Sequence, residues 1–311
     1  MDRYMRAIRA CINKPRKQQL LMRDRGLWSQ LCASLDVIGD ANLAIQAYAD
    51  RAYEDTPGAH YLATYGLSQA FFVQQDAVTH LQEALGLPDT VPNDPLLKDI
   101  REIRNDTVGH PTKRGGRKKG EQPTYHSISR ITLDADGFQL LSYNNGASKS
   151  RNIVTSDLIA MQRDGITGLL TVIIDTLRNQ ERAHKETFKM DRLTAAFPDM
   201  LDYYVEKMFE GAGKRDDAPL ASASIATITQ ALADLRAALE RRDSDLDTYV
   251  GIRSTYDLLN YPLARLKAYY EGDMASTEMT DQAAYIYVYF VRDHLYRLRE
   301  AAQEIDDEYM R

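Results

Sequence analysis

Apolar residues recur along most of this chain at every third or fourth position, which is the spacing of amphipathic α-helices. The clearest run extends from about residue 59 to residue 85, and Gly86 and Pro88 then end it. Further helices are expected over residues 1–21, 27–53, 95–108, 155–188, 220–242, 246–271 and 279–309. Within residues 27–53, the pair Gly39–Asp40 suggests a kink or a break. The pattern predicts a mainly α-helical protein.

The spacing changes in one place. Residues 124–143 alternate between apolar and polar side chains around a turn at Asp134–Gly137, which is typical of a β-hairpin. Residues 211–219 combine glycine, charge and proline and resemble a linker. We therefore expect a helical bundle with an inserted hairpin over residues 1–185. A second α-helical bundle is expected over residues 186–311, with a break at 211–219.

Candidate chemistry lies where the helix over residues 95–108 ends. Arg104 offers a planar fork of donors that suits a phosphate, and Asn105 follows it directly. His110 is a side chain that exchanges protons near neutral pH. A glycine-rich basic loop over residues 111–123 comes next. Its cations, which could attract a polyanion regardless of base sequence, are Lys113, Arg114, Arg117, Lys118 and Lys119.

The six-residue spacing between Arg104 and His110 matters for mechanism. On a continuous α-helix the two side chains would point about 120° apart. Gly109 suits the position after a helix end and Pro111 cannot continue a helix, so the helix is expected to stop at Val108. His110 could then turn back toward Arg104, or each side chain could complement those of a second protomer.

Two neighbouring features leave alternatives open. Gln75 and Asp76, in the long helix over residues 59–85, interrupt its apolar stripe. They form either a solvated face or a polar contact that orients Arg104 or His110. His126, in the first strand of the hairpin, is either a second acid–base group or incidental.

Arg104–Asn105 followed by His110 resembles the Arg-polar-x-His motif of the HEPN superfamily, and the long preceding helix resembles that family as well. The resemblance covers about residues 25–180. It implies an all-α domain that cleaves RNA without a metal or other cofactor, leaving 2′,3′-cyclic phosphate and 5′-OH ends. It also implies a homodimer with a composite site, in a bacterial toxin–antitoxin or phage-defence setting. HEPN domains without catalysis are common, so a non-catalytic RNA-binding or sensor module, or a partner-binding protein, remains open.

Charge is distributed unevenly. The net charge is −6, yet residues 1–26 carry eight Lys or Arg against two Asp, whereas residues 201–311 carry 13 Lys or Arg against 21 Asp or Glu. The acidic C-terminal part would repel a phosphate backbone. RNA is therefore expected on the N-terminal half, and a protein partner such as an antitoxin on the C-terminal half.

The remaining composition narrows the setting. The only cysteines, Cys11 and Cys32, form neither a disulfide framework nor a metal-ligand pattern, which suits a reducing cytoplasm. No metal site is expected. No run of about 18 apolar residues is present, so no membrane span is expected, and the basic N-terminus does not resemble a secretory signal.

Overall fold

The computed structural model describes residues 1–89, 93–116, 122–213, 217–272 and 279–310. It is mainly helical and contains a three-stranded antiparallel sheet, so the predicted mainly-α class is confirmed. The chain forms two compact units. Unit 1 comprises residues 1–14 and 21–178, and unit 2 comprises residues 15–20 and 179–311. The division falls inside a helix at 178/179, where the sequence suggested 185.

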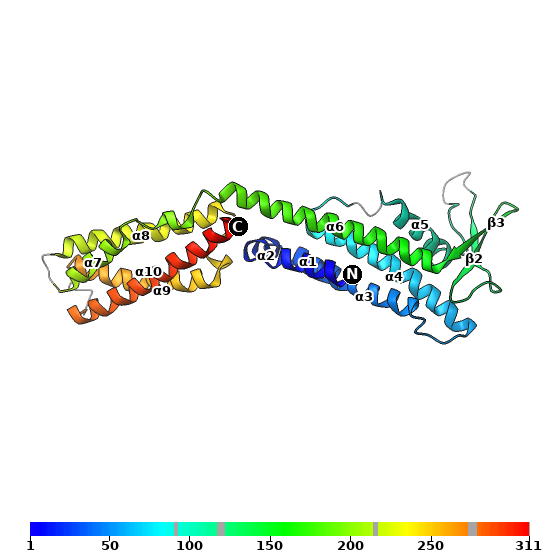
Figure 1. The fold of residues 1–311 in the computed structure, drawn as a ribbon, viewed down its shortest axis with the longest axis horizontal. Coiled ribbons are helices and arrows are strands. Elements are labelled where there is room, and N and C mark those ends of the chain that lie inside the picture. The colour runs from blue at the N-terminus through cyan, green and yellow to red at the C-terminus, as the bar shows by residue number, and fades with distance from the viewer. Residues whose placement is uncertain (90–92, 117–121, 214–216, 273–278, 311) are drawn as a thin grey trace. The chain divides into compact units, whose positions relative to one another are not determined.

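Unit 1 is built on long helices that surround one apolar core (Figure 1). Its helices are α1 (Asp2–Ile12), α3 (Arg25–Ala49), α4 (Pro57–Ala84), α5 (Pro95–Arg104) and the N-terminal part of α6 (Thr155–Phe188). Helices α3 and α4 pack side by side. Helix α3 passes through Gly39 without interruption, so of the two alternatives predicted there, a kink or a break, the break is wrong. Leu35, Phe71 and Leu170 are almost fully buried between these helices.

A small sheet lies at one end of the helices of unit 1 (Figure 1). Its strands are β1 (Tyr125–Ile128), β2 (Gly137–Asn144) and β3 (Ala147–Val154), paired in that order. The predicted hairpin corresponds to β1 and β2, whereas β3 was not predicted. Asn145 and Gly146 both have positive φ and join β2 to β3, as a two-residue hairpin turn requires.

Unit 2 has its own apolar core. Its longer helices are α7 (Leu201–Gly213), α8 (Ala218–Arg241), α9 (Val250–Tyr270) and α10 (Asp281–Met310). Short 3₁₀ turns, η3 (Leu193–Ala196) and η5 (Leu246–Thr248), precede α7 and α9. Most of α2 (Pro15–Met22) also belongs to this unit. The expected linker contains the interruption between α7 and α8, of which residues 214–216 lie outside the described residues.

One ion pair is buried inside unit 2. Arg242 is 1% exposed and donates to Asp306 Oδ1 at 2.9 Å. The Asp306 carboxylate also accepts hydrogen bonds from the backbone N–H groups of Leu193 and Thr194, at 2.9 and 3.0 Å. This carboxylate therefore joins α10 to η3 and to the end of α8.

Candidate functional site

Helix α5, which carries Arg104 as its last residue, is fixed at its start and along one side. The Asp94 carboxylate caps it by accepting from Leu96 and Leu97 N–H at 2.9 and 3.1 Å. Leu97, Ile100 and Ile103 are buried in the core of unit 1. A Cβ added to Gly165 of α6 would lie 2.7 Å from Leu97, so α6 approaches α5 closely only because residue 165 is glycine. These contacts fix the backbone of α5, from which the Arg104 side chain extends.

The chain does not stop cleanly at Val108 as predicted. After Arg104 it widens into a π-helical turn, η2 (Asn105–Gly109), in which His110 N–H donates to Asn105 C=O at 2.8 Å. A π turn joins the C=O of residue i to the N–H of residue i+5. This wider turn brings Gly109 and His110 close to Arg104 and Asn105. A Cβ added to Gly109 would lie 2.9 Å from Arg104 Nη1. The backbone just before His110 therefore lies against the Arg104 guanidinium.

Arg104 is held by polar and aromatic contacts. Its Nη2 donates to Gln69 Oε1 at 3.0 Å, its Nη1 donates to Asn105 Oδ1 at 3.1 Å, and its guanidinium carbon lies 4.1 Å from the ring centroid of Phe72. Its Nε is buried and has no hydrogen-bond partner among the described residues. Since a guanidinium has five N–H donors, three of them remain without a partner in the described part of the chain. His110, by contrast, is exposed.

The polar pair predicted to orient Arg104 or His110 contacts a different arginine. Gln75 Oε1 accepts from Arg101 Nε at 2.9 Å, and Asp76 forms an ion pair with the same guanidinium. Arg101 lies one turn before Arg104, so Gln69 takes the position expected of Gln75. Nor do these residues all form a solvated face, because Gln75 is fully buried and donates to the buried Gln162 at 2.8 Å.

The basic loop divides into two kinds of cation. Lys113 is exposed, as an RNA-binding role requires. Arg114, also predicted to bind RNA, forms ion pairs with Glu102 and Asp106. Its guanidinium is thus engaged by two carboxylates, and its role in RNA binding stays a prediction. The remaining predicted cations, Arg117, Lys118 and Lys119, lie outside the described residues.

The sequence reading missed an acidic row on the motif helix. Asp99, Glu102 and Asp106 follow one another at spacings of three and four residues, which places them on one face of α5 and η2. Arg151 of β3 binds Asp99 through two hydrogen bonds, of 2.9 and 2.6 Å. These hydrogen bonds lower the pKa of Asp99 below its ordinary value, and they outweigh burial, which raises it. The spacing was visible beforehand, but its cationic partners were not.

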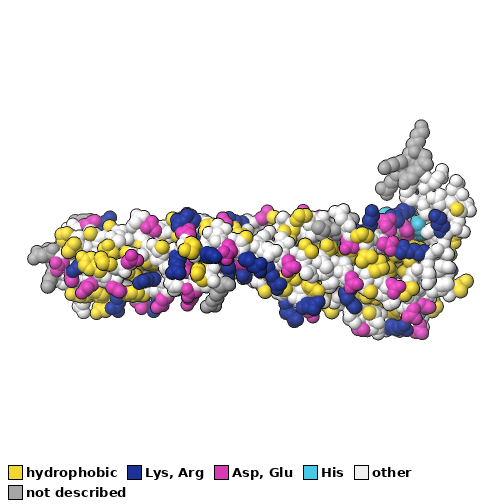
Figure 2. All heavy atoms as spheres, turned by 45° about the horizontal axis from the view of Figure 1, so that its top comes forward, with side chains coloured by type: hydrophobic (Ala, Val, Ile, Leu, Met, Phe, Trp, Pro, Cys, Tyr) yellow, Lys and Arg dark blue, Asp and Glu magenta, His cyan; other side chains and the backbone are white. Residues whose placement is uncertain are grey.

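His126 belongs to the same cluster. Its side chain is 6% exposed, and Nδ1 shares a hydrogen bond of 2.9 Å with Ser142 Oγ. Its Nε2 lies 3.3 Å from Asp106 Oδ1, which is within ion-pair range but outside hydrogen-bond geometry. Figure 2 shows cationic, acidic and histidine side chains close together at the sheet-bearing end of unit 1.

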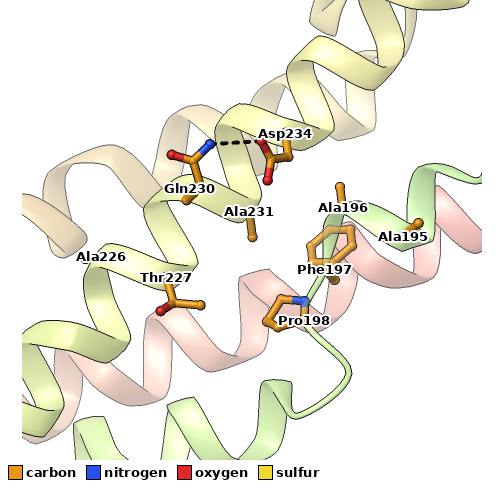
Figure 3. A pocket seen from close by; sticks show the side chains of 9 residues that line it. All are labelled: Ala195, Ala196, Phe197, Pro198, Ala226, Thr227, Gln230, Ala231 and Asp234. Carbon is orange, nitrogen blue, oxygen red and sulfur yellow. Dashed lines mark hydrogen bonds between the residues drawn. The ribbon is translucent and has the colours of Figure 1, made fainter.

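A groove in unit 2 is separate from these residues. A groove of about 490 Å³ in unit 2 lies between α8 and the residues at the end of η3 (Figure 3). Phe197 and Pro198 face it from one side, and Gln230, which is hydrogen-bonded to Asp234 at 2.9 Å, borders the other side. None of the predicted site residues lines it.

The described residues contain neither a metal-binding cluster nor a membrane-spanning helix. No group of three or more His, Cys, Asp or Glu side chains in this part of the chain could hold a metal ion. No described helix combines the length and apolar character that a bilayer crossing needs.

The candidate site thus consists of Arg104, Asn105 and the exposed His110 around a π turn, with an ion-paired sheet beside it. Comparison of the chain with family models, with curated proteins and with solved structures finds no match.

Proposed function

We propose that unit 1 is an endoribonuclease of the HEPN kind, which uses Arg104 and His110 and needs no metal ion. The observation that carries this proposal is the π turn. It folds the chain so that Gly109 lies against the Arg104 guanidinium, while the next residue, His110, is exposed. Arg104 and His110 thus lie at the same end of α5, which supports a shared role in binding phosphate and transferring a proton. π turns of this kind are frequent at functional sites.

The chemistry follows from these two side chains. The ribose 2′-OH attacks the adjacent phosphorus, so the P–O2′ bond forms and the P–O5′ bond breaks. His110 accepts the 2′-OH proton as the P–O2′ bond forms, and the leaving O5′ takes a proton from the resulting imidazolium or from water. Arg104 stabilises the charge that develops on the non-bridging oxygens. The products are a 2′,3′-cyclic phosphate and a 5′-OH. Asn105, which accepts a hydrogen bond from Arg104, holds the guanidinium in place.

A homodimer and a defence setting belong to the same proposal. In HEPN proteins two protomers contribute motifs to one cleft, and an exposed His110 is available to such a partner. Phage defence or a toxin–antitoxin pair would supply the RNA target, and the acidic unit 2 is where an antitoxin or other protein would bind.

One observation favours a second candidate, an RNA-binding or sensor protein that does not cleave. Arg104 already donates to Gln69 and Asn105 and lies over Phe72, which are contacts that a purely structural arginine would also make. In that case Arg104 would support the turn, and the basic loop would bind RNA.

The deciding experiment follows the ends of a 5′-labelled single-stranded RNA in excess EDTA. Wild-type protein is expected to leave 2′,3′-cyclic phosphate ends. His110→Ala should lower cleavage by roughly 10²-fold or more while RNA affinity is nearly unchanged, and Arg104→Ala should impair both. His80→Ala, at an exposed histidine of α4, is the matched control. Cleavage that requires magnesium, or that survives in His110→Ala, would refute the proposal; binding without cleavage would support the second candidate.

A further inference from the structure

The segment that follows His110 is tied to the sheet through its backbone. His126 N–H donates to Pro111 C=O at 2.7 Å. Arg114 and Thr124 exchange two backbone hydrogen bonds, each of 2.8 Å. The chain from Pro111 to Arg114 therefore runs beside the start of β1. His110 lies between two fixed points, the π turn before it and this pairing after it.

The sheet end of unit 1 is in turn tied to the motif helix through charges. The Asp106 carboxylate, two residues after Arg104, faces both Arg114 and His126. We call Asp106, Arg114 and His126 the clasp. Glu102 adds a second carboxylate to Arg114, and Arg151 binds Asp99 one turn earlier on α5. Each contact joins α5 or η2 to the part of the chain that follows His110.

The position of His126 separates it from the reacting groups. Its imidazole is almost fully buried, with Ser142 on one nitrogen and Asp106 near the other. An RNA strand reaches exposed groups such as His110 and not a ring in this position. Ser142 Oγ lies 2.9 Å from Nδ1 and Asp106 Oδ1 lies 3.3 Å from Nε2, so both ring nitrogens face groups of the protein. These contacts suit a residue that holds neighbouring segments together.

We infer that the clasp fixes the position of His110 relative to Arg104, with His126 as the positioning residue. The inference rests on the proposed ribonuclease function. Gly115 and Gly116, which come directly after Arg114, both have positive φ, so the backbone there has little intrinsic preference that would hold the segment. Contacts outside the segment must fix it. Pre-organised placement matters because a displacement of about 1 Å can cost on the order of 10²-fold in rate.

The test combines cleavage with amide hydrogen exchange in the full-length protein. His126→Ala and the milder Asp106→Asn should speed exchange at the His110 and Arg114 amides. They should also lower single-turnover cleavage at saturating RNA by roughly 10- to 100-fold, the usual effect of removing an outer support. RNA affinity should not fall by more than about twofold, because neither substitution removes a cation that would bind phosphate. His126→Gln keeps a polar side chain that can donate to Asp106 and should recover much of the rate. Asp99→Asn, which removes only the Arg151 pair, and Arg130→Ser, at an exposed residue after β1, are the controls.

The outcomes separate this inference from the proposed function. If the variants leave exchange at His110 unchanged, or speed it without slowing cleavage, the positioning role is refuted, and wild-type cleavage still supports the ribonuclease. If wild-type protein does not cleave RNA, the proposed function fails and exchange alone decides whether the clasp holds the segment. If Asp99→Asn slows cleavage as much as His126→Ala does, the slower rate reflects a general loosening of the sheet. That result would refute a specific role for His126.

Discussion

Replacing Gly109 by alanine tests whether the position of the Arg104 guanidinium matters for chemistry. The new Cβ would lie 2.9 Å from Arg104 Nη1 and 3.3 Å from Asn105 Oδ1. Ordinary contact distances are about 3.5–4.0 Å, so the guanidinium must shift by about half an ångström to one ångström. Nη1 is the far end of a flexible side chain, which makes this shift inexpensive for folding. The structure therefore predicts a change in position with little change in stability.

The variant should therefore lose cleavage rate while keeping most of its stability. Gly109→Ala should lower single-turnover RNA cleavage by roughly 10- to 100-fold, because misplacement by up to about 1 Å costs on the order of 10²-fold. The free energy of unfolding should stay within about 1 kcal/mol of wild type, since alanine also restricts the unfolded chain. Cleavage is measured on end-labelled single-stranded RNA in EDTA, and stability by urea unfolding followed by circular dichroism.

Two further glycines make the comparison specific. Gly168 of α6 has no atom within 4 Å of an added Cβ, so Gly168→Ala should keep full activity and gain up to about 1 kcal/mol. Gly165→Ala would push Leu97 and should lower stability before it affects chemistry. If Arg104→Ala impairs cleavage but Gly109→Ala cleaves as fast as wild type, the Arg104 guanidinium does not act from its position beside Gly109.

Three other predictions follow from particular contacts. The first concerns a variant in which serine replaces Lys113, Arg117, Lys118 and Lys119 while Arg114 is retained. The slope of log RNA affinity against log salt concentration should become shallower by up to about 0.7 per lost contact, and the cleavage step should not change. Adding Arg114→Ser should impair cleavage as well. Asp306→Ala leaves the buried Arg242 without a counter-charge and should cost about 3–5 kcal/mol in the urea unfolding of unit 2, whereas an exposed change such as Asp307→Asn should cost little. Because the folded-state pKa of Asp99 is lowered by Arg151, the pair stabilises the protein above the ordinary value of 3.8 and loses that effect as pH falls through the folded pKa. The difference in Tm between wild type and Arg151→Ser should therefore be largest near neutral pH and narrow below pH 3.8; a difference independent of pH would contradict this account.

The helices could be predicted because local signals agree with their final surroundings. Thr155 begins α6 and Phe188 ends it where the apolar spacing indicated, since a helix buries one face whatever its neighbours are. Strand β3 lacked such a signal, because most of its residues are exposed and polar, and its pattern does not alternate. The Asn145–Gly146 turn was the available indication, and it fits the two-residue hairpin that the structure contains.

The site was harder to predict because its contacts depend on how α4 and α5 lie against each other. That Gln75 contacts Arg101 and Gln69 contacts Arg104 is set by the register of the two helices, which no local pattern contains. The π turn is similar. Gly109 and Pro111 indicated an α-helix that continues to Val108, whereas the α-helix ends at Arg104 and Gly109 is the last residue of the π turn. The hydrogen bond from the Thr107 hydroxyl to Ile103 C=O and the close approach of Gly109 to Arg104 appear only in the folded chain.

The pairing of Arg114 also bears on how an acidic helix could serve an RNA site. Asp99, Glu102 and Asp106 would place three negative charges within about two turns of Arg104 and would oppose a phosphate there. Arg114 and Arg151 contribute two positive charges directly against them. The cation that the sequence assigned to RNA therefore reduces the repulsion that RNA would otherwise meet at Arg104. Removing Arg114 should weaken RNA binding because the carboxylates are then left without their positive partner. Glu102→Gln should therefore restore part of the RNA affinity that Arg114→Ser loses. If Arg114 contacted a phosphate directly, Glu102→Gln would not restore the affinity.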